Sequence, residues 1–193
     1  MKKNLRFIIL AVLLFLIVGA FYIVLTRQKD VNDIEEVTTE VSRVQQLIQK
    51  NISDDYPPTP KEVVKLYADI TVAFYTENYT EEELDQLGDK MRELFDRELL
   101  LNNPRDVYLM NLKKEISDFQ AKGIKVSSYA TSAATDVDFF SQDGYKFARL
   151  NLVLTIRQDK EAGLTKEKML LRRDDEGHWK IYGWQLIRDD SVE

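Results

Sequence analysis

The sequence contains no cysteine and only one histidine among its 193 residues. The lack of cysteine excludes a disulfide framework and thiolate catalysis. The chain also lacks the ligand spacing of a zinc site, a glycine-rich phosphate loop and the turn motif that carries a nucleophilic serine. We therefore predict a protein that is not an enzyme and that holds no metal and no cofactor.

Acidic residues are missing from the first 29 positions, where the charged residues are Lys2, Lys3, Arg6, Arg27 and Lys29. All 33 aspartates and glutamates follow, against 22 of the 27 lysines and arginines. The remainder of the chain is thus strongly acidic, which disfavours nucleic acid and anionic lipid headgroups as partners. A cationic peptide or protein is compatible with this charge.

One long hydrophobic run, residues 7–25, carries no charge, and as a helix it would extend roughly 28 Å, close to the hydrocarbon thickness of a bilayer. Its N-terminal flank is the more basic, which predicts cytoplasmic residues 1–6 and an extracytoplasmic C-terminal domain. We expect a single-pass anchor in the cell membrane. The alternative is a signal peptide cleaved after Val18-Gly19-Ala20, although five further apolar residues follow that site. Both alternatives export the domain.

Residues 26–58 are predicted to form a membrane-proximal helix and a linker. Between residues 30 and 52, apolar side chains recur at intervals of three and four, which indicates a helix with one apolar stripe. This helix is either a dimerising stalk or an amphipathic helix that packs on its own domain. The proline-rich residues 56–60 would follow as a stiff spacer.

Residues 59–190 are predicted to form an α+β domain in which three helices pack on a curved antiparallel sheet. Helix starts are indicated at Thr59, Thr80 and Asn103, the first two by capping boxes. The second helix is expected to extend to Leu99, and Gly123 ends the third. The apolar period then changes from 3.6 to 2, which predicts strands over 124–131, 135–141, 145–157, 164–173 and 178–188.

This order of elements resembles the nuclear-transport-factor-two-like (cystatin-like) fold. The closing segment Trp179-Lys180-Ile181-Tyr182-Gly183-Trp184 is similar to the last strand of many such domains. The opening residues 59–67 look like those of membrane-anchored, uncharacterised proteins of Gram-positive bacteria. The resemblance implies a cone-shaped pocket between the helices and the sheet. It says little about activity, because this fold carries many functions.

Two groups of residues are candidates for binding. Tyr67, Phe74 and Trp179 are expected to line the cone, with Glu77 near its mouth. Alternation along the strands places a second group on the opposite sheet face, namely Tyr145, Phe147, Tyr182 and Trp184. A solvated face should not carry such rings, so a second copy, the 30–52 helix or a partner is expected to cover it. The alternative is that a bulge turns some of the rings toward the core.

These features predict a membrane-anchored, extracytoplasmic binding or assembly domain without catalytic activity. Two alternatives stay open. One is a small pocket enzyme of the isomerase or dehydratase type, which a buried acid with a raised pKa inside the cone would favour. The other is a structural subunit of a cell-envelope complex. His178 and the acidic residues 174–176 are interpreted as parts of a surface turn.

Overall fold

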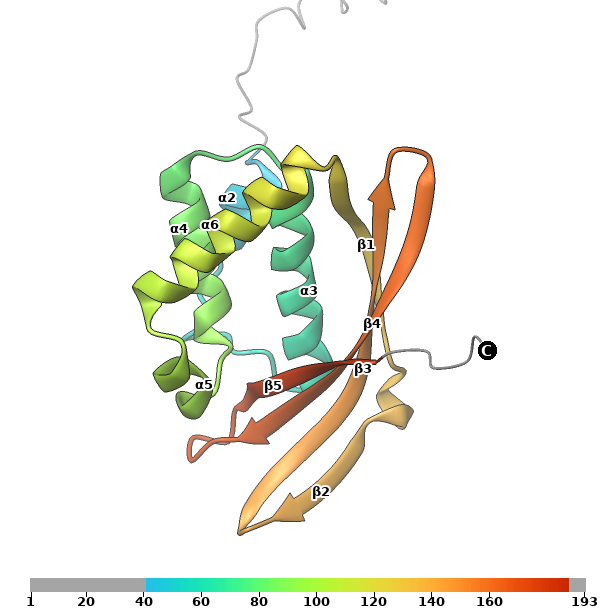
Figure 1. Cartoon of the computed structure of the whole chain (residues 1–193). Helices are drawn as coiled ribbons and strands as arrows, with labels where there is room; N and C mark the ends of the chain where they lie inside the picture. Colours follow the sequence, from blue (N-terminus) through green and yellow to red (C-terminus); the bar gives the residue numbers. More distant parts are fainter. Residues whose placement is uncertain (1–40, 188–193) are drawn as a thin grey trace, which may run out of the picture. The chain divides into compact units, whose positions relative to one another are not determined.

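The computed structural model describes residues 41–187 of the chain (Figure 1). The predicted cytoplasmic residues 1–6, the predicted membrane segment 7–25 and the first part of the predicted stalk lie outside the described residues. Within 41–187, none of the helices has both the length and the apolar character needed to cross a bilayer.

The helices of the first half of the domain are α2 (Arg43–Gln49), α3 (Pro60–Thr76), α4 (Glu81–Glu93), α5 (Arg97–Asn102) and α6 (Arg105–Ala121). Two of them, α3 and α4, begin at the predicted capping residues Thr59 and Thr80. The Thr59 hydroxyl accepts a hydrogen bond from the Glu62 N–H, and Thr80 with Glu83 forms a reciprocal capping box. These side chains satisfy backbone donors that a helix start leaves free.

The expectation of one continuous second helix to Leu99 was wrong. The helix α4 ends at Glu93, and Asp96 caps the separate helix α5. Between them, residues 94–96 pair with the last strand: Ile181 N–H donates to Leu94 O, and Asp96 N–H donates to Ile181 O, each at 2.8 Å. This long-range pairing satisfies backbone groups that would otherwise bond within a helix, so the helix breaks here.

The second half is one antiparallel sheet, as predicted. It consists of β1 (Ile124–Thr131), β2 (Asp138–Gln142), β3 (Tyr145–Gln158), β4 (Glu161–Arg173) and β5 (Trp179–Ile187), with the short 3-10 helix η1 (Ala134–Asp136) before β2. The order is β1-β3-β4-β5, and β2 also pairs with β3. Both β1 and β2 lie on the same edge of β3, one after the other along its length.

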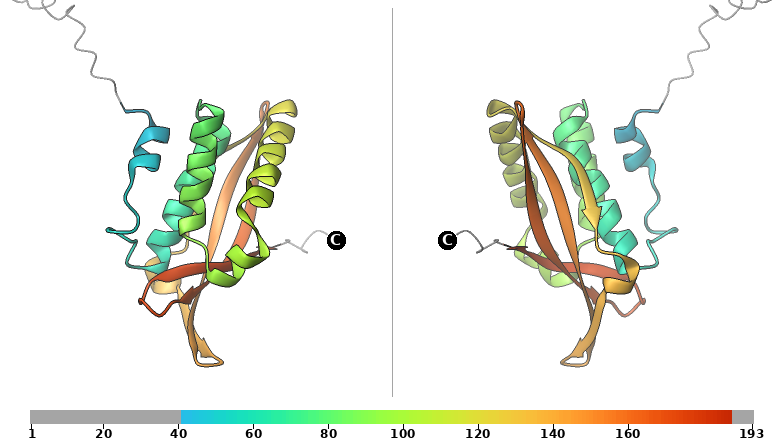
Figure 2. Two further views of the ribbon diagram at one scale, coloured as in Figure 1. Left: turned by 90° about the vertical axis from the view of Figure 1, so that its left-hand side faces the viewer. Right: turned by 90° about the vertical axis from the view of Figure 1, so that its right-hand side faces the viewer.

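The helices cover one face of this twisted sheet (Figure 2). The described residues therefore confirm an α+β architecture with helices packed on an antiparallel sheet. The core lies between α3 and the inward side chains of β3, β4 and β5, where Val63, Leu152 and Leu171 are fully buried.

The described part of the predicted stalk packs on the domain. Val44 of α2 and Ile52 of the following turn are each 1% exposed and belong to the core. Residues 41–52 therefore pack on their own domain, as the second alternative for residues 30–52 predicts, and are helical over Arg43–Gln49.

Candidate functional site

Alternation along β4 directs one row of side chains toward the helices. Met169 and Leu171 are fully buried in this row, and Glu167 and Thr165 continue it along the same face. The partners of Met169 and Glu167 on β3 are Leu150 and Leu152, which are also buried. A carboxylate thus lies in line with the apolar core rather than on the solvated face.

A bulge in β5 changes which face its last residues use. Gly183 pairs with Leu170, whereas Ile181 pairs with Leu171, so Tyr182 is an extra residue without its own partner on β4. The alternation shifts by one residue, and Trp184 now lies opposite the buried Met169. The prediction that Trp184 belongs to the outer face with Tyr182 was therefore wrong, and the alternative of a bulge is correct for this ring.

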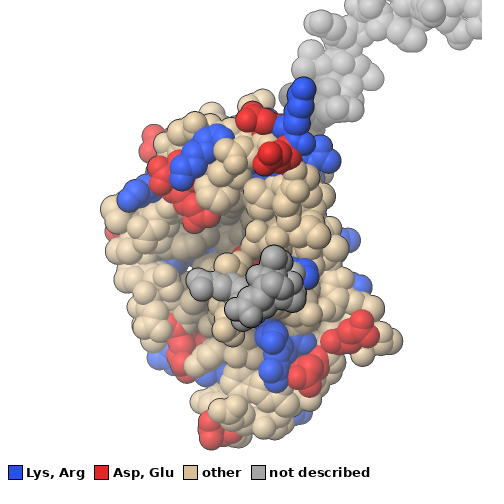
Figure 3. Space-filling model, turned by 45° about the vertical axis from the view of Figure 1, so that its right-hand side comes forward, with Lys and Arg blue, Asp and Glu red and all other residues tan. Residues whose placement is uncertain are grey.

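The shifted Trp184 forms part of a cavity between the helices and the sheet. The cavity has a volume of about 390 Å³, within the range of small-molecule sites. The space-filling view in Figure 3 shows that the surface is hollowed on this side. The lining residues are Tyr67, Thr71, Phe74, Tyr75, Met91, Phe95, Tyr108, Leu112, Glu115, Phe119, Ile124, Val126, Leu154, Ile156, Thr165, Glu167 and Trp184.

Aromatic rings from α3, α6, the α4–α5 connection and β5 form much of this lining. The Trp184 ring lies 5.8 Å from Tyr67 and 6.2 Å from Phe95, centroid to centroid. Phe95 also makes an edge contact with Tyr108 at 5.7 Å. These rings support one another at the distances typical of favourable aromatic pairs.

Two glutamates interrupt the apolar lining. Glu167 Oε2 is enclosed, and no group among the described residues hydrogen-bonds to it. Burial raises the pKa of the Glu167 carboxyl above its usual value, and the negative charge of Glu115 adds to the shift. Glu115 is exposed while it lines the cavity, so it lies at the mouth, where its Oε1 accepts a hydrogen bond from the Tyr75 hydroxyl at 2.5 Å.

The tyrosines of the cavity stay protonated at neutral pH. Burial raises the pKa of Tyr67 well above its ordinary value, and the charge of Glu167 is the next contribution. Burial also raises the pKa of Tyr75 and of Tyr108, in the latter case against the opposing charge of Arg92. The cavity thus presents neutral hydroxyls beside two acidic groups.

The structure separates the residues predicted to line the cone. Tyr67 and Phe74 line the cavity, whereas Trp179 does not and instead packs at 5.6 Å from Phe139 at the other end of the sheet. Glu77 is the C-cap of α3 and is not part of the lining.

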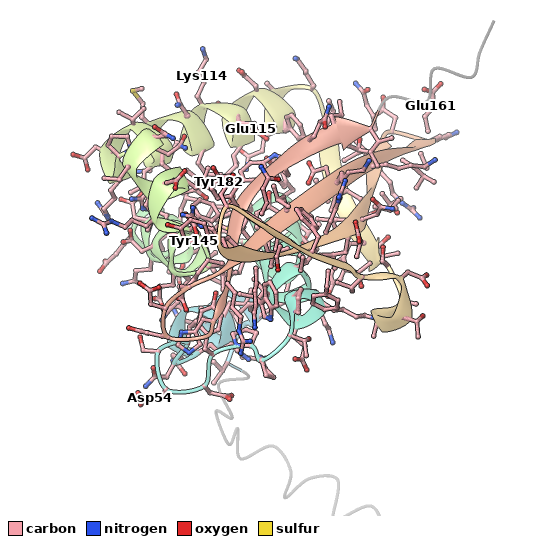
Figure 4. All side chains as sticks on the ribbon, turned by 90° about the horizontal axis from the view of Figure 1, so that it is seen from below. Asp54, Lys114, Glu115, Tyr145, Glu161 and Tyr182 are labelled. Atoms are coloured by element: carbon pink, nitrogen blue, oxygen red, sulfur yellow. The ribbon has the colours of Figure 1, made fainter. Side chains whose placement is uncertain are left out.

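The aromatic residues of the outer face pack on one another and on arginines. Phe147 stacks on Phe140 at 5.4 Å and meets the edge of Tyr182 at 5.8 Å. The Arg172 Cζ lies 4.8 Å from the ring centroids of both Tyr145 and Tyr182, which Figure 4 labels. These contacts within the chain stabilise the rings on the outer face, because the positive charge of an arginine is attracted to the face of an aromatic ring.

Two other features of the described surface are less suited to a ligand. A larger hollow of about 590 Å³ lies between α5 and β4, but Arg172 there is already bound by Asp96 and Glu98. At the β4–β5 turn, Asp174, Glu176 and His178 offer ligand atoms within 4.8 Å of one another. Asp174 Oδ1, however, accepts the His178 N–H at 2.7 Å, which closes the turn.

Sequence reasoning missed the carboxylates of the cavity. The sequence does carry a signal for Glu167, because this residue is separated from the apolar Met169 and Leu171 by two and four positions and therefore lies on the same face of the strand. Phe95 and Tyr108 carried no comparable signal, since their position depends on the break between α4 and α5 and on the path of α6.

Comparison with known proteins gives a family match and a similarity to solved structures. The structure is similar to that of an IcmL-like type IV secretion system protein from Legionella pneumophila subsp. pneumophila strain Philadelphia 1, with 12% sequence identity and a TM-score of 0.39. That alignment covers 70% of this chain and 98% of the other, and a likeness of this degree carries no functional argument. No curated protein matched. The family model described as Domain of unknown function (DUF6715) matches residues 1–184, and the chain therefore belongs to this family.

Proposed function

We propose that residues 41–187 form a binding domain without catalytic activity, whose ligand enters the cavity between the helices and the sheet. The aromatic lining of this cavity, supplied by Tyr67, Phe95, Tyr108 and Trp184, carries the proposal. Rigid rings around a space of about 390 Å³ can enclose an apolar group at low entropic cost.

A variant that fills the cavity tests this proposal. Leu112 is half-buried and lines the cavity, so Leu112→Trp should occupy part of its volume. The matched control is Leu101→Trp, because Leu101 is 69% exposed and lies outside the cavity. We expect 2-phenylethanol to bind the full chain and the control equally, measured by saturation-transfer NMR, and to bind the filled variant at least tenfold more weakly. Equal binding to all three proteins would refute the proposal.

The place of the domain in the cell is a second part of the proposal. Residues 7–25 anchor the chain in the cell membrane with residues 1–6 in the cytoplasm, and the domain has the nuclear-transport-factor-two-like fold outside. The charge-free run and its basic N-terminal flank support this orientation. Protease added to intact cells is expected to digest the chain beyond residue 30. Protection in intact cells together with digestion in lysed cells would contradict it.

A small pocket enzyme is the second candidate, and the raised pKa of the Glu167 carboxyl favours it. A partly desolvated glutamate beside the neutral Tyr67 hydroxyl could accept and return a proton, as an isomerase or dehydratase requires. The two candidates differ in what happens to a bound molecule. Any ligand recovered chemically changed after incubation with the full chain, but unchanged with Glu167→Gln, would establish the enzyme.

A structural subunit of a cell-envelope complex is the third candidate. The exposed ring of Phe139, 58% accessible, favours an assembly surface at the β2 end of the sheet for a second copy or an envelope protein. Light scattering of the full chain and of Phe139→Asp tests this role. We expect the variant to have the lower mass if two copies meet at this face, and an unchanged mass would exclude self-assembly through Phe139.

A further inference from the structure

The position of the Glu167 carboxylate is energetically unfavourable. Its Oε2 is enclosed in the cavity, and no hydrogen-bond donor among residues 41–187 reaches it. A carboxylate without a partner in such surroundings costs free energy that a glutamine or a leucine would avoid. The neighbouring Glu115 increases the cost, because it places a second negative charge at the same cavity. A ligand that supplies the missing positive charge would remove this cost.

The walls of the cavity fit a cation as well. The rings of Trp184, Tyr67, Phe95 and Tyr108 present π-electrons, and an ammonium group over such rings is attracted to them. Among the described residues that line the cavity, none is lysine or arginine. Arg92 packs over the Tyr108 ring at 5.5 Å, but its guanidinium donates to the Asn103 carbonyl and is not part of the lining.

We propose that the cavity binds an organic ammonium group carried on a short aromatic or aliphatic stem. Glu167 is its counter-ion, the rings enclose the stem and the ammonium, and Glu115 with Tyr75 lies at the entrance. The proposal rests on the proposed function and names the chemical class of the ligand. The acidic character of the chain after residue 29 would also attract such a cation from a distance.

Three probes of similar shape separate this proposal from simple apolar binding. They are phenethylammonium, the neutral 2-phenylethanol and the anionic 3-phenylpropanoate, each titrated against the full chain by NMR. We expect the ammonium to bind about tenfold or more tightly than the alcohol, and the carboxylate not to bind. Equal affinity of ammonium and alcohol would overturn the cation proposal while leaving the binding cavity in place. Failure of all three to bind would overturn both.

Two glutamate variants locate the charge that is responsible. Glu167→Gln keeps the shape of the side chain and should abolish the preference for ammonium over alcohol. Glu161→Gln is the matched control, because Glu161 lies on the same strand, is exposed and is at the far end of the β3–β4 hairpin in Figure 4. A preference that survives in Glu167→Gln would overturn the assignment of Glu167, and the two wild-type titrations decide the proposal even if this variant does not fold.

The ammonium group could belong to a free amine or to a lysine of a protein partner. Nα-acetyl-lysine methylamide is the probe for the second source, titrated in the same way. Tighter binding of this probe than of phenethylammonium would identify a lysine side chain as the ligand, and weaker binding would identify a free amine. Either result supports the ammonium class, whereas binding of neither ammonium probe would overturn it.

Discussion

The ring of Trp184 on β5 lies 5.8 Å from the ring of Tyr67 on α3, on the helix-facing side of the sheet. The contact exists because the extra residue Tyr182 shifts the alternation of β5. Both rings line the same cavity. The extra residue Tyr182 therefore directs Trp184 toward the helices, where the Trp184 ring forms one wall of the proposed binding site.

Replacement of Trp184 by alanine should impair binding more than stability. The ring is 43% exposed, so its loss should lower the free energy of unfolding by only about 1–2 kcal/mol, below the cost of a fully buried tryptophan. The affinity for phenethylammonium should fall about tenfold, because a wall of the cavity is removed. Trp179→Ala is the matched control, since Trp179 lies on the same strand outside the cavity. Equal losses of affinity in the two variants would contradict the assigned lining.

Replacement of Asp96 by alanine should be among the most destabilising changes in the domain. Asp96 is 3% exposed, caps α5 and holds Arg172 through two hydrogen bonds. Its removal leaves a largely buried arginine without its partner and the start of α5 without its cap. The free energy of unfolding, measured in urea, should fall by about 3–5 kcal/mol. Glu98→Ala removes the exposed partner of the same arginine, and a loss as large as that of Asp96→Ala would show that burial is not the cause.

At Gly88, close packing against a neighbouring helix should outweigh the gain in helix propensity from a substitution by alanine. A Cβ at this position of α4 would overlap with the Leu109 Cδ2 of α6, and Leu109 is 5% exposed. Propensity alone predicts that Gly88→Ala gains about 1 kcal/mol, but overpacking costs about 1–3 kcal/mol. We expect a net loss of about 1 kcal/mol in urea unfolding. Gly163→Ala, with no atom within 4 Å of the added methyl group, should show no loss.

Local signals predicted most of the helix starts and the sheet, because capping boxes and alternation act over a few residues. Thr59 and Thr80 cap the helices that they were expected to cap. The features that build the cavity are not local. The break at residues 94–96 depends on pairing with Ile181, and the bulge at Tyr182 depends on the register with β4. Neither leaves a pattern in the nearby sequence, which is why Trp184 was assigned to the wrong face.

Binding of the ammonium probe should depend on pH through Glu167. Burial and Glu115 raise the pKa of this carboxyl, so protonation sets in at a higher pH than for an ordinary glutamate. Glu115 from α6, Tyr67 from α3 and Tyr108 from α6 also face the cavity, and the raised pKa of each tyrosine keeps it neutral in this range. The affinity for phenethylammonium should therefore fall as the pH drops through the Glu167 transition.

The control for this titration is 2-phenylethanol, whose affinity should not change over the same range. Phenethylammonium stays protonated throughout, so the probe itself contributes no transition. A decline for both probes would indicate that the cavity changes its shape in acid. An affinity for ammonium that rises as the pH falls would contradict the role of Glu167 as counter-ion.

The same carboxylate should reduce the stability of the domain without ligand. Because the pKa of Glu167 is raised in the folded state, the folded chain holds its proton to a higher pH than the unfolded chain does. Stability should accordingly fall as the pH rises from the ordinary glutamate range through the Glu167 transition, and stay reduced above it. Glu167→Gln carries no charge at any pH. It should therefore raise the free energy of unfolding by about 1 kcal/mol at pH 7, with the gain vanishing in acid.

Urea unfolding at both ends of the pH range measures this gain, with Glu161→Gln as the exposed control expected to show none. A stabilised Glu167→Gln that has lost its preference for ammonium would mean that the chain keeps a costly charge for the sake of its ligand. If the variant is instead less stable than the wild type at pH 7, Glu167 has a favourable partner within the folded chain, and a ligand is not needed to balance it.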